Sequence, residues 1–364
     1  MSPHRPGSVL PPAAVGAAAT RQTPNPGVQL LRGQRHRIAR KTALVCGILG
    51  LIVFGLFSAN VLLGSFTVTV PDFFAMLFGK TIPGASFIVM ENKLPRAVLG
   101  LLVGGAFGVA GAVFQTLLRN PLASPDIIGI SGGASASAVA AIIFFSAGGM
   151  TVSVISIVGA VLVALLISGL AGRDAGGRLI LIGIGVAAMA NAFVAFVLQR
   201  AEISRAQDAL IWLTGSLNSA NWDRISALVV GLLVATPFVL YFAARLAGLQ
   251  LGEDTAAGLG ISVGRSRTGL IVVGVVLAAL ATAAAGPIAF VSFLAGPIAR
   301  RLLGGRVSLL AAALVGAAIV LAADYIAAYL IPGAALPVGV VTGAAGAPFL
   351  IWLLISRNRQ GNGG

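Results

Sequence analysis

Charged side chains are scarce in this chain: Asp, Glu, Lys and Arg together make up 9% of its 364 residues. Soluble domains carry about a quarter of such residues, whereas hydrophobic side chains here reach 58%. This composition excludes an ordinary soluble fold and predicts an all-α polytopic membrane protein. A chain of this length can hold roughly ten spans of about 20 residues each, joined by short connections.

Histidine and cysteine are also scarce. The only histidines, His4 and His36, lie in the N-terminal tail, which argues against histidine-based catalysis and metal binding. The lone Cys46 lies in the first apolar run and cannot form an intrachain disulfide. Gly79-Lys80-Thr81 resembles the end of a phosphate-binding loop, but Phe74 stands where the first glycine would be required. We therefore expect no enzyme activity, and no cofactor or metal, in this chain.

The net charge of +14 is explained by topology. The chain lacks a dense basic patch interleaved with aromatic side chains, so nucleic-acid binding is not expected. Its basic residues lie in the tails and between the apolar runs. If the N-terminus is cytoplasmic and ten spans follow, 18 of the 24 Lys and Arg residues fall on the cytoplasmic side. This bias agrees with the positive-inside rule and predicts that both termini are cytoplasmic.

The apolar runs predict three parts. Residues 1–41 form a basic cytoplasmic tail that is expected to be disordered, residues 42–356 form the transmembrane domain, and residues 357–364 form a C-terminal tail. A short interfacial helix is expected after Val70-Pro71-Asp72. The ten spans are expected at Thr42–Leu63, Leu94–Leu118, Pro125–Phe145, Thr151–Ala171, Leu179–Leu198, Ile225–Ala244, Thr268–Ala285, Pro287–Leu303, Ser308–Leu330 and Leu336–Ile355.

Small and amide side chains in the spans predict helix contacts. Gly100, Gly104 and Gly108 recur every fourth residue, a spacing that lets helix backbones approach closely in lipid. The amides of Gln115 and Asn191 lie in apolar surroundings, so each needs a partner on another helix or a wet path. We interpret Gln115 as a helix–helix contact, whereas for Asn191 a helix contact and a place on a substrate path both remain open.

Asp324 is the one carboxylate well inside an expected span. A proton-coupled secondary transporter would use such a group, and this is the alternative function. Proton relays need further titratable partners, however, and the other spans offer none. A capping or hydrogen-bonding role for Asp324 is therefore the preferred interpretation.

The connection Arg245–Arg267 is the longest between spans, and it mixes apolar residues with Glu253 and Asp254. Its part Leu249–Gly260 is expected to form two short helical pieces joined at glycines. An amphipathic pair of this kind indicates a docking surface for a partner protein. The other interpretation, helices lying on lipid headgroups, is disfavoured because two carboxylates would face anionic lipid.

Seven motifs in order resemble one family, the ten-helix permeases of the bacterial ATP-binding-cassette (ABC) importers for iron siderophores, haem and vitamin B12. The resemblance covers about Thr42 to Arg357. The motifs are Lys93-Leu94-Pro95-Arg96, the glycine-rich helix ending in Gln115, Arg119-Asn120-Pro121-Leu122-Ala123-Ser124-Pro125, Trp212-Leu213-Thr214-Gly215-Ser216, Leu251-Gly252-Glu253-Asp254, Gly286-Pro287-Ile288-Ala289-Phe290, and Leu336-Pro337-Val338-Gly339-Val340-Val341-Thr342-Gly343.

This resemblance implies an assembly in the bacterial cytoplasmic membrane, with ferric siderophores as the closest substrate class. Its other members would be a second permease chain, identical or different, two cytoplasmic ATPase subunits that hold ATP and magnesium, and an extracytoplasmic binding protein. It also implies site roles by position. Gly252, Glu253, Asp254 and Gly258 would couple to the ATPase, Lys93 and Arg96 would meet acidic residues of the binding protein, Arg173, Asp174, Gly176, Gly177 and Arg178 would form an inner gate, and Asn191 would line the path.

Overall fold

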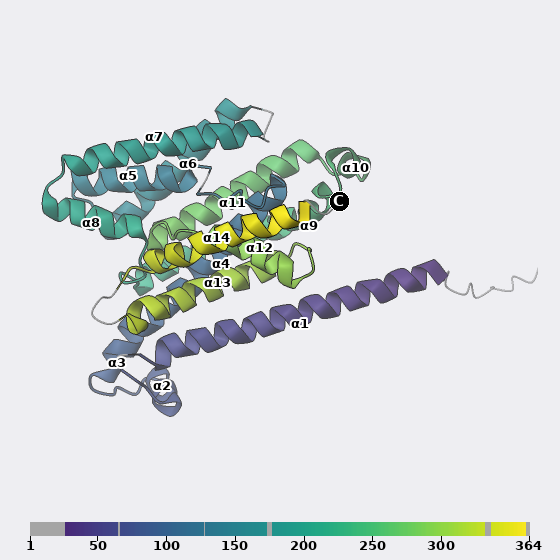
Figure 1. The fold of residues 1–364 in the computed structure, drawn as a ribbon. Helices are drawn as coiled ribbons and strands as arrows, with labels where there is room; N and C mark the ends of the chain where they lie inside the picture. Colours follow the sequence, from purple (N-terminus) through teal and green to yellow (C-terminus); the bar gives the residue numbers. More distant parts are fainter. Residues whose placement is uncertain (1–25, 65, 127, 173–176, 332–335, 362–364) are drawn as a thin grey trace, which may run out of the picture. The chain divides into compact units, whose positions relative to one another are not determined.

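The computed structural model describes residues 26–64, 66–126, 128–172, 177–331 and 336–361, and no strand occurs among them (Figure 1). The chain divides into two units, Met1–Ala43 and Leu44–Gly364. The helices are α1 (Pro26–Leu62), α2 (Val70–Leu77), α3 (Ala85–Phe87), a π-helical turn (Ile88–Lys93), α4 (Leu94–Leu117), α5 (Ile130–Phe145), α6 (Gly149–Ala171), α7 (Gly177–Gln199), α8 (Ile203–Thr214), α9 (Trp222–Leu249), α10 (Glu253–Gly258), α11 (Val263–Ala285), α12 (Val291–Leu302), α13 (Leu309–Tyr325), a second π-helical turn (Ile326–Leu330) and α14 (Val338–Gly361).

The helices include seven stretches, among the described residues, that are long and apolar enough to cross a membrane. Two shorter apolar helices, Ile130–Phe145 and Val338–Trp352, accompany them. The prediction of an all-helical membrane protein is confirmed. The interfacial helix expected after residue 70 is α2, where the Thr69 side chain accepts a hydrogen bond from the backbone amide of Asp72.

Helix boundaries differ from expectation where local backbone geometry intervenes. The first unit is helical from Pro26, so the disorder expected for residues 26–41 is not seen; the apolar run behind them lets the helix propagate. The third expected span begins at Ile130 and not at Pro125, because residues 120–126 form turns and Gly129, at a φ of 87°, immediately precedes the helix. Likewise α12 begins only at Val291, after Phe290 at a φ of 65°.

Two connections between the spans differ from the predicted organisation. The polar stretch after α7 contains an additional helix, α8, which buries Ala209 and exposes Ile203 and Ile211. The two helical pieces expected in Leu249–Gly260 are wrong, since only α10 forms there. Leu249 instead completes α9, whose last turn is held by burial of Leu246, and Gly252 at a φ of 113° turns the chain into α10.

Helix α4 is the centre of the second unit and packs against α9, α11, α12 and α13. A Cβ on Gly104 would lie 2.6 Å from the backbone oxygen of Gly316, and one on Gly108 would lie 2.2 Å from that of Ala312. Both contacts are with α13, so the predicted close approach of backbones is confirmed. Behind this contact Phe107 and Phe114 are fully buried.

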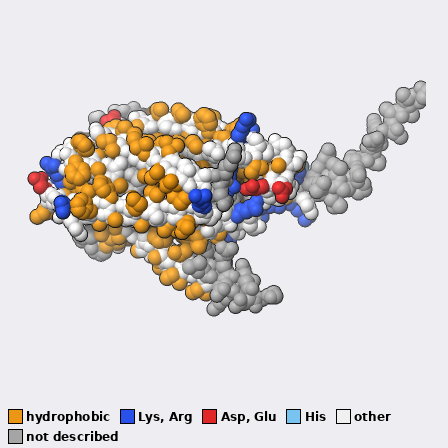
Figure 2. Space-filling model, turned by 90° about the horizontal axis from the view of Figure 1, so that it is seen from above, with side chains coloured by type: hydrophobic (Ala, Val, Ile, Leu, Met, Phe, Trp, Pro, Cys, Tyr) orange, Lys and Arg blue, Asp and Glu red, His pale blue; other side chains and the backbone are white. Residues whose placement is uncertain are grey.

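The surface of the second unit is apolar over a broad band. Figure 2 shows hydrophobic side chains over the middle of the face in view, with charged ones toward either end. Large exposed side chains of this kind include Leu162 on α6, Leu181 and Met189 on α7, and Leu240 on α9. In water such a surface would drive aggregation, whereas it matches the hydrocarbon core of a membrane or a partner chain.

The contact between α4 and α13 predicts a difference between two neighbouring glycines. Gly108→Ala places its Cβ on the Ala312 backbone, so we expect it to destabilise the protein by about 1–3 kcal/mol. Gly105→Ala is the matched control, because its Cβ would meet nothing closer than 3.9 Å. Thermal unfolding of the detergent-purified variants measures this, and equal melting temperatures would contradict the contact.

Candidate functional site

Lys93, predicted to contact a binding protein, lies at the start of α4 and is only 4% exposed. Its Nζ donates to the backbone oxygens of Leu63 and Phe66, each at 2.6 Å, and lies 5.9 Å from the centre of the Tyr329 ring. The ammonium therefore ties the end of the first span to α4. Its role in docking stays a prediction.

Arg96 is one turn further along α4 and pairs with Asp324 of α13. Its Nε donates to Oδ2 at 2.8 Å and its Nη2 donates to Oδ1 at 2.8 Å, a bidentate arrangement. The Asp324 side chain is 1% exposed and that of Arg96 is 17% exposed. Each charge thus compensates the other in an apolar environment, as the preferred interpretation of Asp324 requires. The proton-coupled alternative stays a prediction that uptake measurements test.

Gln115 is near the other end of α4, and the predicted helix contact is confirmed. Its Nε2 donates to the backbone oxygen of Phe293 at 2.9 Å, and its Oε1 accepts from Nη2 of Arg300 at 2.9 Å. Gly296 gives the amide room, because a Cβ there would lie 2.1 Å from Oε1. The amide and Arg300 together fasten α12 to α4.

A second carboxylate inside the fold, Asp126, was missed by the sequence analysis, and it is only partly buried. Asp126 lies in the turn before α5, where Oδ1 accepts from Ser131 Oγ and Oδ2 accepts from Ser292 Oγ at 2.7 Å. Ser292 itself is fully buried at the start of α12. The signal available was a lone acid between two apolar runs, but only the fold brings the two serines to it.

The predicted coupling residues form a compact surface at the end of α9. Ala256 is fully buried and packs in a cluster with Val113, Leu246, Leu249 and Leu270. Its burial fixes α10 against α4, α9 and α11. Glu253 Oε1 accepts from Arg267 Nη1 at 3.2 Å.

The outward side of this surface carries Leu251 and Leu259, each 63% exposed, and the exposed Asp254 and Gly258. Apolar and acidic groups are thus presented on a fixed backbone. Gly252, Glu253, Asp254, Gly258, Leu251 and Leu259 make up what we call the α10 surface.

The structure describes only some of the remaining predicted residues. Arg173, Asp174 and Gly176 of the expected inner gate lie outside the described residues, whereas Gly177 and Arg178 begin α7 and are exposed. Asn191 is exposed on α7. It is therefore not enclosed by helices of its own chain, which agrees with a path or partner surface better than with an internal helix contact.

The comparisons with known proteins identify the family. The FecCD transport family model matches residues 50–356. The chain belongs to the FecCD transport family. Ferric enterobactin transport system permease protein FepG of Escherichia coli (strain K12) is 39% identical over 331 residues, 89% of this chain and 99% of the relative.

Two further relatives of this FecCD chain agree with it. Iron(3+)-hydroxamate import system permease protein FhuG of Bacillus subtilis (strain 168) is 35% identical over 330 residues, 87% of this chain and 98% of the relative. A solved structure described as an inward-facing ABC transporter of the metal-chelate type is 25% identical, with a TM-score of 0.76 over 86% of this chain and 99% of its own. The resemblance found in the sequence is confirmed, and the protein is a multi-pass protein of the bacterial inner membrane.

Two ion pairs of this FecCD chain, one buried and one exposed, predict losses of stability of different size when a charge is removed. Asp324→Asn leaves Arg96 buried without a counter-charge, so we expect a loss of about 3–5 kcal/mol in stability. Glu202→Gln removes the exposed partner of Arg205 and should cost less than about 1 kcal/mol. Thermal unfolding in detergent distinguishes them; a melting temperature of Asp324→Asn close to that of Glu202→Gln would refute the structural role.

Proposed function

We propose that this chain is the transmembrane permease subunit of an ABC importer for ferric siderophores. It works with a second permease chain, two ATPase subunits that bind and hydrolyse ATP, and an extracytoplasmic binding protein. The observation that carries the proposal is the α10 surface, a rigid, partly apolar and acidic protrusion on a chain of the FecCD family. The relatives named for ferric enterobactin and iron(3+)-hydroxamate support the substrate class.

Ten spans with cytoplasmic termini are part of this proposal. The connections fall into two groups by their contacts. At one end, Trp222 Nε1 donates to the Met90 oxygen and Arg205 Nη1 donates to the Ile143 oxygen. At the other, Arg119 Nη2 donates to the Leu249 oxygen. These contacts support the alternation of ten spans, with α5, α12 and α14 counted beside the seven long ones, and the 18 basic residues support a cytoplasmic α10 end.

The α10 surface couples the ATPase to the transport path. Leu251 and Leu259 give a partner groove apolar anchors, and Asp254 gives it a charge to recognise. Because α10 rests on Val113 of α4 and Leu270 of α11, a displacement of α10 is passed directly to the spans.

The extracytoplasmic end receives the binding protein. Lys93 and Arg96 shape this end through Leu63, Phe66 and Asp324, so their part in docking is to hold the surface in position. Exposed cations such as Lys80 and Arg200 are accessible to acidic groups of a partner. As the family resemblance implies, residues 173–178 act as the inner gate of the path, and Asn191 lines that path.

A charge reversal tests the coupling role. Asp254→Lys with Glu253→Lys should reduce co-purification of the ATPase at least tenfold and abolish uptake, because the acidic side of the α10 surface is inverted. Asp208→Lys is the control, an exposed acid on α8 that should leave both unchanged. Retained co-purification with normal uptake would show that α10 is not the coupling element.

The substrate and the energy source are tested by uptake of radiolabelled iron into a strain that lacks the chain. A panel of ferric enterobactin, ferric hydroxamate and ferric citrate should give uptake of at least one complex when the chain is restored. Uptake should cease when the ATPase carries a substitution of its phosphate-binding lysine, and it should persist when the proton gradient is collapsed. Uptake that follows the proton gradient and ignores the ATPase would overturn the proposal.

A further inference from the structure

An apolar groove runs along the outside of the second unit between α9 and α11. One hollow, of about 120 Å³, lies between α6, α9 and α11, and a second, of about 320 Å³, continues between α9 and α11. Between the two hollows Gly231 of α9 packs against Leu280 of α11, since a Cβ on Gly231 would lie 2.7 Å from a methyl group of Leu280. We call the pair the α9–α11 groove.

The lining of the groove follows one stripe on each helix. On α9 it includes Arg224, Ala227, Gly231, Val234, Phe238 and Phe242. Eighteen residues of helix separate the first from the last of these, about 27 Å at 1.5 Å per residue. This length is close to the hydrocarbon thickness of a bilayer, about 30 Å.

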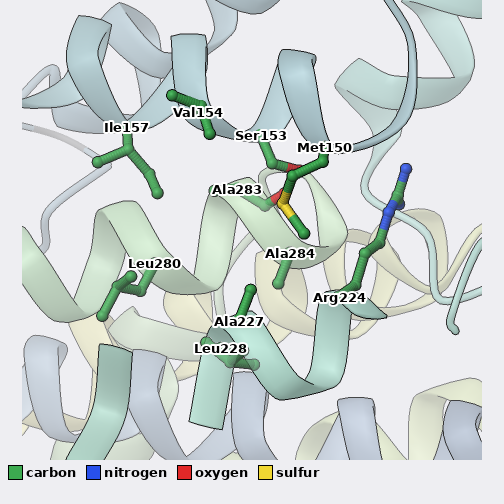
Figure 3. Close-up of a pocket in the computed structure, with 10 residues that line it drawn as sticks. All are labelled: Met150, Ser153, Val154, Ile157, Arg224, Ala227, Leu228, Leu280, Ala283 and Ala284. Atoms are coloured by element: carbon green, nitrogen blue, oxygen red, sulfur yellow. The ribbon is translucent and has the colours of Figure 1, made fainter. Parts of the chain in front are cut away.

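The two ends of this stripe carry cations. Arg224, in the first turn of α9, lies at one end of the first hollow, and Ile157 and Leu280 lie at the opposite end (Figure 3). At the other end Arg245 lies against Tyr241, with its guanidinium carbon 4.0 Å from the ring centre. Arginines at the two ends of an apolar stripe of membrane thickness lie at the levels where phosphate headgroups are found.

Arg224 also has unused hydrogen-bonding capacity. Its Nη1 donates to Ser219 Oγ, but its Nε is buried and has no hydrogen-bond partner among the residues that the structure describes. A buried donor without an acceptor is costly. No carboxylate pairs with Arg224 among the described residues, so a phosphate group at its Nη atoms would balance the charge of the guanidinium.

We propose that the α9–α11 groove binds an anionic phospholipid, with the phosphate at Arg224 and an acyl chain along Val154, Leu280, Val234 and Val272. Val154, Val234 and Val272 are more than half exposed in the chain by itself. A second copy of the chain is a poorer occupant. Two copies share one orientation in the membrane, so a symmetric contact along this stripe would bring like charges at Arg224 together.

Native mass spectrometry of the purified full-length chain, titrated with phosphatidylglycerol or phosphatidylethanolamine, tests the proposal. The unmodified chain should retain phosphatidylglycerol in preference to phosphatidylethanolamine. Val234→Trp fills the groove and should reduce retention of both lipids at least tenfold. Its control is Leu162→Trp, an equally apolar, exposed position on α6 outside the groove, which should retain both.

Two further variants separate the headgroup from the acyl chain. Arg224→Gln should lower phosphatidylglycerol affinity about fivefold and remove the preference over phosphatidylethanolamine, as expected for one cation at a lipid surface. Arg200→Gln, an exposed arginine on α7, should preserve the preference. Equal retention in Val234→Trp and Leu162→Trp would overturn the proposal, as would unchanged preference in Arg224→Gln.

The remaining occupant, a second copy, is addressed by crosslinking. Val234→Cys in a Cys46→Ala background should give no disulfide-linked dimer in membranes. Efficient crosslinking there would assign the groove to a chain–chain contact and would also overturn the proposal.

Discussion

The backbone contact between α4 and α13 is the constraint on which the rest of the second unit depends. Lipid removes the hydrophobic drive that would press two soluble helices together, so association has to come from close packing and internal polar contacts. Gly104 and Gly108 permit that packing, since any side chain at either position would overlap α13. The Arg96–Asp324 pair and the Gln115 contacts with α12 then lock the two ends of α4. The glycines bring the helices together, and the polar groups fix their register.

The same sequence features differ in how far they could be interpreted before the structure. Long apolar runs and a four-residue glycine spacing are local signals, so most spans and the close helix contact were predictable. The partner of Asp324 was not, because 228 residues separate it from Arg96. Asp126 escaped for the same reason: Ser292 is 166 residues away. Helices α5 and α12 each begin after a single residue with positive φ, Gly129 and Phe290. A phenylalanine rarely adopts this conformation, so the sequence did not indicate where α12 begins.

Lys93 and Arg96 illustrate how a motif can be recognised while the physical role of its residues is only partly predicted. Position within the motif predicted contact with a partner for Lys93 and Arg96. In the folded chain both cations have internal acceptors that compensate their burial. A motif that serves the architecture and one that serves recognition have the same appearance in a sequence, and only the hydrogen-bond partners in the structure distinguish them.

The anchoring of α10 has a mechanical consequence. The helix rests on Val113, and Val113 belongs to the same α4 whose glycines are seated on α13 and whose far end is clamped to Asp324. These contacts oppose both bending of α4 and sliding of α4 against α13. Force applied at α10 is therefore transmitted along the packed pair of helices α4 and α13. Rearrangements of this fold should occur as rigid-body movements of the α4–α13 pair relative to α5, α6 and α7, which pack against one another, and not as flexing within the pair.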